Sequence, residues 1–307
     1  MHRIISSVAL TGMIAIAGCS TGSAVPSSGA APADKVISVV ATTTQLTDLA
    51  TVIGGRNARV YGVLKANVDP HDYEPSPGDI NALAKADVIV KNGVGLEDWF
   101  DDTIKSASPK GRIVDASQGI KIRSGRGDKA EPDPHIWHDP GNVAVMVTSI
   151  EKAMEEAAPD AAGDLQRNLA DYKAKLTQLD SDVKDKLGQL RNKRLVTNHD
   201  AFGYYIDHFG LEFVGSIIPS FDTSAELSAT QIADIVAKIR STGTKAVFSE
   251  SSLPPKTAEA IGKEAGVRVV AGEDALYGDS LGPAGSAGDT YLKMQEHNTK
   301  VIVDNLS

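Results

Sequence analysis

Two spacings of apolar residues alternate along the chain from residue 36 onward. Short continuous apolar runs are typical of strands buried on both faces, and apolar residues at every third or fourth position are typical of helices that pack by one side. In the first half, the runs predict strands at 36–41, 59–64, 87–91 and 112–114. The wider spacing predicts a helix that Thr42–Thr44 cap and Gly54-Gly55 end, and further helices at 78–85, 96–104 and 142–157.

A long amphipathic stretch follows. Its apolar residues recur at spacings of three and four, so they form one stripe on a helix of roughly 30 residues, about 45 Å long. They are Leu165, Leu169, Tyr172, Leu176, Leu179, Val183, Leu187 and Leu190. A coiled-coil strand and a single helix packed along a globular body both fit this stripe, and we favour the single helix.

The alternation resumes after this stretch. It predicts strands at 194–197, 212–217, 246–249 and 267–270, and helices at 201–208, 227–240, 255–265 and 290–305. Strands that alternate with helices on both sides of one long helix predict an α/β fold with two parallel-sheet lobes. We therefore expect a first lobe at 35–158, a rigid linking helix at 159–191 and a second lobe at 192–307.

The N-terminus has a targeting pattern. A short basic start is followed by an apolar run that is too short for a typical membrane-spanning helix. The run ends in Ala17-Gly18-Cys19, which resembles a bacterial lipoprotein signal in which the cysteine carries the lipid. We predict a signal peptide at 1–18, lipidation of Cys19 and a flexible tether at 19–34. The alternative is a buried helix that contains the cysteine by chance.

Composition disfavours some classes of partner and of binding site. The net charge of −9 argues against a nucleic-acid partner and is compatible with attraction of cations. With 41% hydrophobic and 23% charged residues, the chain beyond its N-terminus is typical of a globular protein. The single cysteine excludes an intramolecular disulfide and argues against a cysteine-based metal site.

Histidines gather next to acidic residues and prolines. The chain has seven histidines, and four of them lie in three such settings: His71 within Asp-Pro-His-Asp-Tyr-Glu-Pro, His135 and His138 within Asp-Pro-His-Ile-Trp-His-Asp-Pro, and His199 before Asp200. Neutral imidazole is a common ligand of transition metals, and a nearby carboxylate orients the ring or adds an oxygen ligand. The clustering predicts a metal site.

The predicted sheets place these residues at one kind of edge. His71, His199 and Glu250 fall at or just past the carboxyl ends of predicted strands. Ligands of parallel α/β sheets bind beyond those ends. The sequence therefore predicts that these residues lie where a ligand of the sheets would bind.

Several motifs in order resemble those of the solute-binding lipoproteins of bacterial ABC transporters for zinc and manganese. They are Asp-Pro-His-Asp-Tyr-Glu-Pro at 69–75, Pro-His-Ile-Trp-His-Asp-Pro at 134–140, His-Asp-Ala-Phe-Gly-Tyr at 199–204, Gly-Asp-Ser at 278–280 and Gly-Asp-Thr-Tyr at 288–291. Two further stretches, 92–97 and 248–252, are also similar. The resemblance covers residues 36–307 and implies two α/β lobes joined by one long helix, with the metal between them.

The resemblance also implies a ligand set, namely His71, His135, His199 and Asp279. Glu273, Asp274 and Asp289 are rival acids near Asp279. His138 and Glu250 are candidates for contacting the ligands from behind, and direct ligation is an alternative for both. Solvent exposure is a further alternative for His138, and a structural role is one for Glu250. Trp137 is expected to pack in the core or to wall the site.

Three imidazoles and one carboxylate form a closed set of four ligands, which suits holding a metal, whereas catalysis keeps a position open for water. We therefore expect no enzyme. Together with the lipoprotein-like signal, the resemblance implies a monomeric, lipid-anchored receptor on the outer face of the cytoplasmic membrane that passes a divalent metal to an ABC permease. A metal-stabilised surface adhesin, a metal-dependent hydrolase and a receptor for an organic ligand are the alternatives.

The nitrogen-rich ligand set favours zinc as the cargo, with manganese second. In the resembled family, glutamate at the third ligand position goes with manganese, and this chain has His199 there. The stretch 121–134 contains no histidine, whereas many dedicated zinc members have a His-rich loop at this place.

Overall fold

The computed structural model describes residues 35–125 and 131–307, which belong to one compact unit. The predicted signal peptide, Cys19 and the tether lie outside the described residues. None of the helices in the described ranges is both long enough and apolar enough to cross a membrane.

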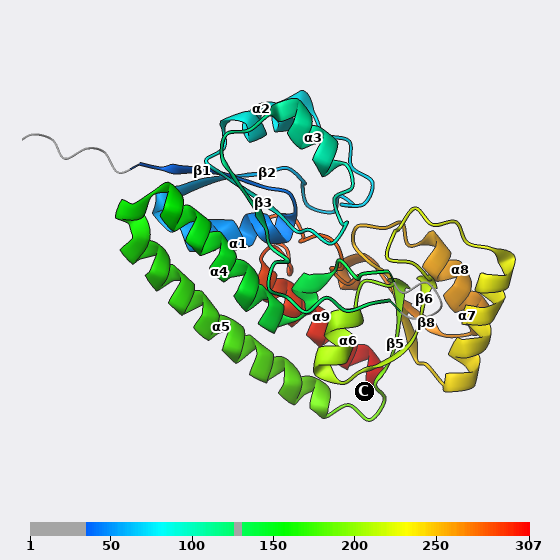
Figure 1. Cartoon of the computed structure of the whole chain (residues 1–307). Coiled ribbons are helices and arrows are strands. Elements are labelled where there is room, and N and C mark those ends of the chain that lie inside the picture. The colour runs from blue at the N-terminus through cyan, green and yellow to red at the C-terminus, as the bar shows by residue number, and fades with distance from the viewer. Residues whose placement is uncertain (1–34, 126–130) are drawn as a thin grey trace, which may run out of the picture. The chain divides into compact units, whose positions relative to one another are not determined.

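The first sheet contains four parallel strands in the order β2-β1-β3-β4. They are β1 (Ile37–Ala41), β2 (Ala58–Gly62), β3 (Val88–Lys91) and β4 (Arg112–Asp115). Helices cover both faces: α1 (Thr44–Gly54) and α4 (Pro140–Ala157) lie on one side, and α2 (Pro77–Lys85) and α3 (Phe100–Ala107) on the other (Figure 1). Val39 and Val40 are both buried, each in a different core, which is why these strands are continuously apolar.

The second sheet repeats this arrangement in the order β6-β5-β7-β8, again all parallel. Its strands are β5 (Arg194–His199), β6 (Glu212–Ile218), β7 (Ala246–Phe248) and β8 (Arg268–Val270). Its helices are α6 (Gly203–Phe209), α7 (Ala229–Thr242), α8 (Lys256–Ala265) and α9 (Tyr291–Leu306). The predicted α/β fold with two parallel sheets is confirmed.

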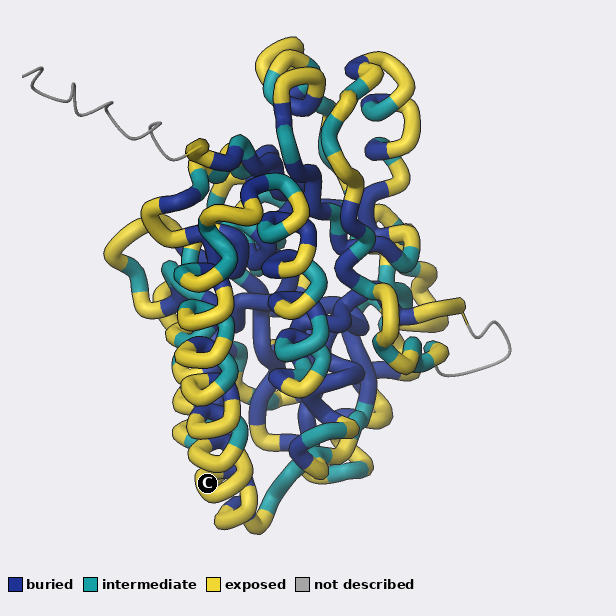
Figure 2. Tube along the Cα trace, turned by 60° about the vertical axis from the view of Figure 1, so that its left-hand side comes forward, coloured by how far each residue is buried: buried dark blue, intermediate teal, exposed yellow. Residues whose placement is uncertain are grey.

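A single long helix, α5 (Ala162–Gly188), follows the strands of the first sheet in the chain and precedes those of the second. It spans 27 residues, about 40 Å. Its apolar stripe is buried against α1, α4, α6 and α9 rather than against another chain, which confirms the single packed helix. Buried positions gather in the interior of the unit in Figure 2, and exposed ones cover the outer helices. The division into lobes at 158 and 192 stays a prediction. Helix α9 packs against α1 and α5, and the Tyr291 N–H donates to Asp48 of α1 over 2.8 Å, so the largest core is shared by both halves.

The helix predicted at 96–104 begins later, at Phe100. Gly93, Val94 and Gly95 all have positive φ angles, of 84°, 59° and 75°, which turn the chain away from a helix. The Glu97 carboxylate then accepts hydrogen bonds from the backbone N–H groups of Asn92 (2.6 Å) and Gly93 (3.1 Å). Glu97 therefore stabilises a loop instead of opening a helix.

Candidate metal centre

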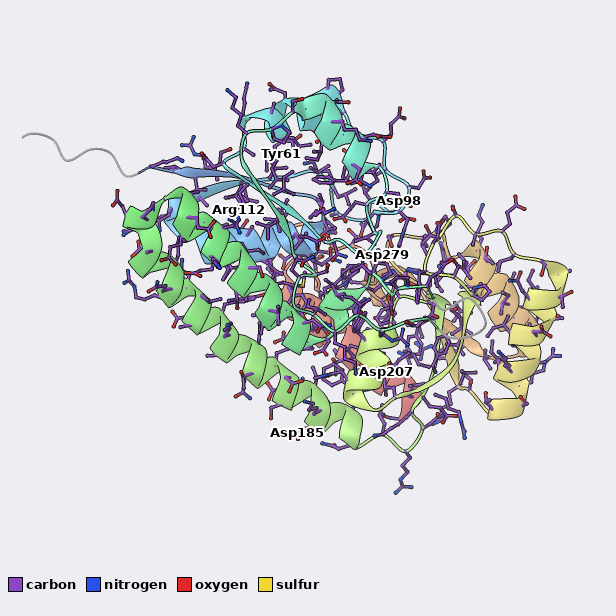
Figure 3. All side chains as sticks on the ribbon, viewed as in Figure 1. Tyr61, Asp98, Arg112, Asp185, Asp207 and Asp279 are labelled. Carbon is purple, nitrogen blue, oxygen red and sulfur yellow. The ribbon has the colours of Figure 1, made fainter. Side chains whose placement is uncertain are left out.

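Four loops and strand ends bring the predicted ligands together. His71 lies in the loop after β2, and His135 immediately precedes a short 3-10 helix (Ile136–His138) after β4. His199 is the last residue of β5, and Asp279 follows β8. One ligand atom from each lies within 4.8 Å of the others. Figure 3 locates Asp279 near the middle of the molecule, where loops from the two sheets meet.

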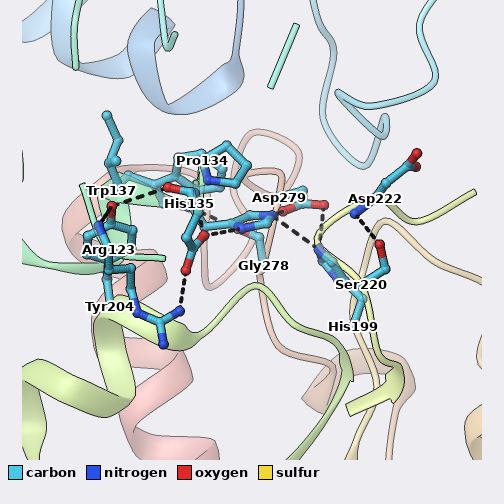
Figure 4. Close-up of polar contacts among 12 residues, drawn as sticks. Arg123, Pro134, His135, Trp137, His199, Tyr204, Ser220, Asp222, Gly278 and Asp279 are labelled. Carbon is cyan, nitrogen blue, oxygen red and sulfur yellow. Dashed lines mark hydrogen bonds and ion pairs between the residues drawn. The ribbon is translucent and has the colours of Figure 1, made fainter. Parts of the chain in front are cut away.

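The distances describe a tight cage with every imidazole Nε2 facing inward. Asp279 Oδ1 lies 3.2 Å from His135 Nε2, and Asp279 Oδ2 lies 3.1 Å from His199 Nε2 (Figure 4). Asp279 Oδ2 also lies 3.6 Å from His71 Nε2. The Nε2 atoms of His135 and His199 are 3.3 Å apart. Ligands at about 2.0 to 2.1 Å from a tetrahedral ion are separated by about 3.3 Å. The cage therefore has the size of a first coordination sphere.

Burial and charge set the protonation of this cage. Burial opposes a charge on His135, but the Asp279 and Asp133 carboxylates raise its pKa to about 9. Burial likewise opposes a charge on His199, yet Asp279 and Glu250 raise its pKa well above the usual 6.5. Although burial raises the pKa of Asp279, the two imidazoles hold it well below its usual value. Without a metal, the carboxylate therefore favours protons on His135 and His199, whereas burial lowers the pKa of His71.

Two carboxylates orient the imidazoles from behind. His135 Nδ1 donates to Asp133 Oδ1 over 2.8 Å, and this oxygen also accepts the His135 backbone N–H at 3.0 Å. Glu250 Oε1 holds His199 in the same way, at 2.8 Å from Nδ1 and 3.1 Å from the backbone nitrogen. With the proton on Nδ1, each Nε2 lone pair points into the cage.

A buried ion pair extends the support of His135. The Arg123 guanidinium donates to Asp133 over 2.6 Å and to Asp207 of α6 over 3.0 Å. Tyr204 donates to the backbone carbonyl of Asp133 and accepts the Arg123 backbone N–H (Figure 4). A Cβ at Gly203 would lie 1.8 Å from the guanidinium, so this close approach requires glycine.

The motifs predicted that a nearby carboxylate orients the imidazole, but they did not single out Asp133, and no role was predicted for Arg123. For Asp133 a local signal existed, because an aspartate two residues before a histidine reaches both the backbone and the ring of that histidine. Arg123 had no such signal, since Asp133 lies ten residues further along the chain and Asp207 belongs to α6. Asn92 also supports the site, because its side-chain amide donates to the Pro134 carbonyl over 2.9 Å.

Asp133→Asn is expected to weaken zinc binding by about 10- to 100-fold while one zinc still binds per chain. The amide keeps the volume of the side chain but removes the charge that orients His135. Zinc affinity is measured by competition with a chelator, with Asp72→Asn as the matched control because Asp72 is exposed beside His71. Unchanged affinity in Asp133→Asn would contradict the orienting role.

The other histidine of the second motif is not part of the cage. The His138 ring is fully buried and stacks on Phe202 at 4.5 Å, and burial lowers its pKa to about 3. The alternative prediction that His138 faces solvent was therefore wrong. Trp137 lies 5.4 Å from the His135 ring and donates from Nε1 to the Gly278 carbonyl over 3.1 Å, so it walls the site and links two ligand loops.

The rival acids do not join the cluster within the described part of the chain. Glu273 and Asp274 are exposed, and Asp289 pairs with Lys293 over 2.8 Å.

Comparison with known proteins identifies the family. A sequence profile described as "Zinc-uptake complex component A periplasmic" matches residues 39–305. The chain is 30% identical to the manganese-binding lipoprotein MntA of Bacillus subtilis (strain 168), over 100% of each chain. It is 31% identical to the iron ABC transporter substrate-binding lipoprotein MtsA of Streptococcus pyogenes serotype M1, over 90% of this chain and 91% of the relative. The fold matches the periplasmic zinc binding protein TroA from Treponema pallidum with a TM-score of 0.82 and 29% identity, over 88% of this chain and 98% of that one.

These matches run along nearly the whole described chain, and they agree with the resemblance drawn from the motifs. The chain belongs to the zinc-uptake component A family of metal ABC transporter substrate-binding proteins, which are receptors and not enzymes.

Proposed function

We propose that this protein captures a divalent metal ion outside the cytoplasm and delivers it to an ABC permease. The observation that carries the proposal is the convergence of three imidazole Nε2 atoms and one carboxylate in a buried cage. The relatives MntA, MtsA and TroA are named for binding or transport of manganese, iron and zinc, which supports a metal as the cargo.

The proposed ligands are His71, His135, His199 and Asp279. Two of them follow strands of the first sheet and two belong to the second. A bound ion would therefore bridge the proposed lobes at 35–158 and 192–307, and its release would require these lobes to move apart around the helix at 159–191.

We propose zinc as the physiological cargo, with manganese as the second candidate. Three nitrogens and one carboxylate suit tetrahedral zinc, and ligand-atom separations of 3.1–3.6 Å match a small coordination sphere. Intrinsic affinity also favours zinc over manganese. Coordination through both carboxylate oxygens of Asp279 would favour manganese, which prefers more oxygen ligands.

Growth of a deletion strain under separate zinc and manganese limitation distinguishes the two metals. The strain is expected to grow poorly when zinc is limiting and to recover when zinc is added. Growth is the better measurement because affinity favours zinc whichever metal is transported. Recovery with manganese alone would overturn the choice of zinc.

The purified protein provides a test of metal capture itself. Zinc bound only to the folded state is expected to raise the melting temperature, by an amount that grows with free zinc, and a chelator is expected to reverse the shift. A melting curve unchanged by zinc, manganese and chelator would contradict metal capture. Screening metabolites in the same assay tests the alternative of an organic ligand.

The proposed location is the outer face of the cytoplasmic membrane, with a lipid on Cys19 as the anchor and the permease as the membrane partner. The relatives named lipoproteins support this location. We propose a monomer, because one chain supplies all four candidate ligands.

A further inference from the structure

The loop between β6 and α7 lies beside the metal cage, and its shape is fixed by its own contacts. The Ser220 carbonyl accepts the Asp200 backbone N–H over 3.2 Å, which ties the loop to the residue after His199. The Asp222 carboxylate accepts both the backbone N–H and the hydroxyl of Ser224 at 2.8 Å (Figure 4 shows Ser220 and Asp222 near His199). Residues 219–224 are called the cover loop below.

The cover loop contacts the cage from two sides. The Phe221 ring lies 5.9 Å from the His135 ring. Thr223 donates its hydroxyl to Asp69 Oδ2 over 2.6 Å, across a sequence separation of 154 residues. The other oxygen of Asp69 accepts the backbone N–H of His71 over 2.9 Å. One carboxylate therefore connects the cover loop to the backbone of a candidate ligand.

His71 is the candidate ligand nearest to solvent. Its side chain is 7% exposed, whereas those of His135, His199 and Asp279 are 0% exposed. A metal ion that enters or leaves this cage therefore passes beside His71, and the His71 loop must yield. A second hydrogen bond, from the Asn67 backbone N–H to the Ser280 hydroxyl over 2.8 Å, joins the same loop to the neighbour of Asp279.

We propose that the hydrogen bond from Thr223 to Asp69 is a latch that holds the His71 loop closed and slows metal exchange. The inference rests on the proposed function, since it concerns the rate at which that metal leaves. Thr223 is a positioning residue, because it acts through Asp69 and not on the metal. Its acceptor is a charged carboxylate, and the short distance is typical of a strong, charge-assisted hydrogen bond. The latch joins the two halves of the chain, so it must open when they separate.

Substitution of Thr223 separates the hydroxyl from the shape of the side chain. Thr223→Val keeps the branched shape and removes the donor, whereas Thr223→Ser keeps the donor. Zinc release from the loaded full-length protein is followed by stopped flow with an excess of a chromophoric chelator. Release is expected to be about tenfold faster for Thr223→Val and close to the wild-type rate for Thr223→Ser, with one zinc per chain in both. Thr177→Val, an exposed position on α5, is the matched control and is expected to leave the rate unchanged.

A second measurement does not depend on metal. Hydrogen–deuterium exchange of peptides that cover residues 65–75 in the metal-free protein is expected to be faster in Thr223→Val than in Thr223→Ser or the wild type. An unchanged release rate in Thr223→Val, or an equal acceleration in Thr177→Val, would overturn the latch. If the wild type bound no zinc or manganese, the proposed function would fail. Deuterium exchange would then decide on the latch alone: faster exchange in Thr223→Val would support the contact, and equal exchange would refute it.

Discussion

Asp279→Asn is expected to lower the affinity for zinc by about 70- to 900-fold. Structural zinc sites with four ligands bind with a free energy of about 10 to 16 kcal/mol, which corresponds to roughly 2.5 to 4 kcal/mol per ligand. Among the residues that the structure describes, Asp279 supplies the only carboxylate of the cage, and it faces all three imidazoles at 3.1–3.6 Å. Asparagine keeps the shape of the side chain and removes its charge.

The measurement is equilibrium dialysis with zinc, followed by metal analysis of the protein. Asp274→Asn is the matched control because Asp274 is exposed and lies outside the cage in the same part of the chain. The melting temperature of each metal-free variant shows whether it is folded. Wild-type stoichiometry and affinity in Asp279→Asn would contradict its role as a ligand and would return the rival acids to consideration.

About two protons are expected to leave the protein for each zinc ion that binds at neutral pH. Asp279 and the orienting carboxylates raise the pKa of His135 to about 9 and that of His199 well above 6.5, despite their burial. His135 is therefore protonated at neutral pH in the metal-free protein and the proton on His199 is favoured, whereas a metal binds only neutral imidazole. Each proton that the metal displaces costs about tenfold in affinity per unit of falling pH, so two cost about 100-fold per unit.

Titration calorimetry in buffers of different ionisation enthalpy counts the released protons directly. The apparent affinity for zinc is expected to rise steeply between about pH 6 and pH 8, below the pKa of His135. His297→Gln serves as the control, because His297 hydrogen-bonds to the Ala275 carbonyl away from the cage, and its proton count should equal that of the wild type. Binding of zinc without proton release would show that the histidines are already neutral.

Much of the fold could be predicted because its signals are local. The apolar residues on α5 recur every three or four positions, which predicts a helix with one buried side. Unbroken apolar runs predict strands that are buried on both faces. The cap of α1 was also readable, since the Thr43 side chain accepts the Leu46 backbone N–H. The start of α3 was not, because the Glu97 carboxylate bonds to the Asn92 and Gly93 backbones and to the Thr42 hydroxyl, 55 residues away.

For the site, the sequence alone determined which residue types gather at strand ends, and the order of motifs indicated a ligand set. Imidazoles beside acids and prolines predict a metal-binding loop from a short stretch of sequence, because such segments form loops with accessible ring nitrogens. Only the tertiary structure decided that one ligand atom from each of three histidines and one aspartate lie within 4.8 Å of one another. It also decided that Asp133 rather than His138 supports His135. The contacts of Arg123 with Asp133 and of Thr223 with Asp69 were likewise visible only in the structure. Apart from the contact of Asp133 with its near neighbour His135, these contacts join separate segments of the chain, so no local pattern encodes them. They exist because the packing of the helices along α5 fixes which strand ends meet.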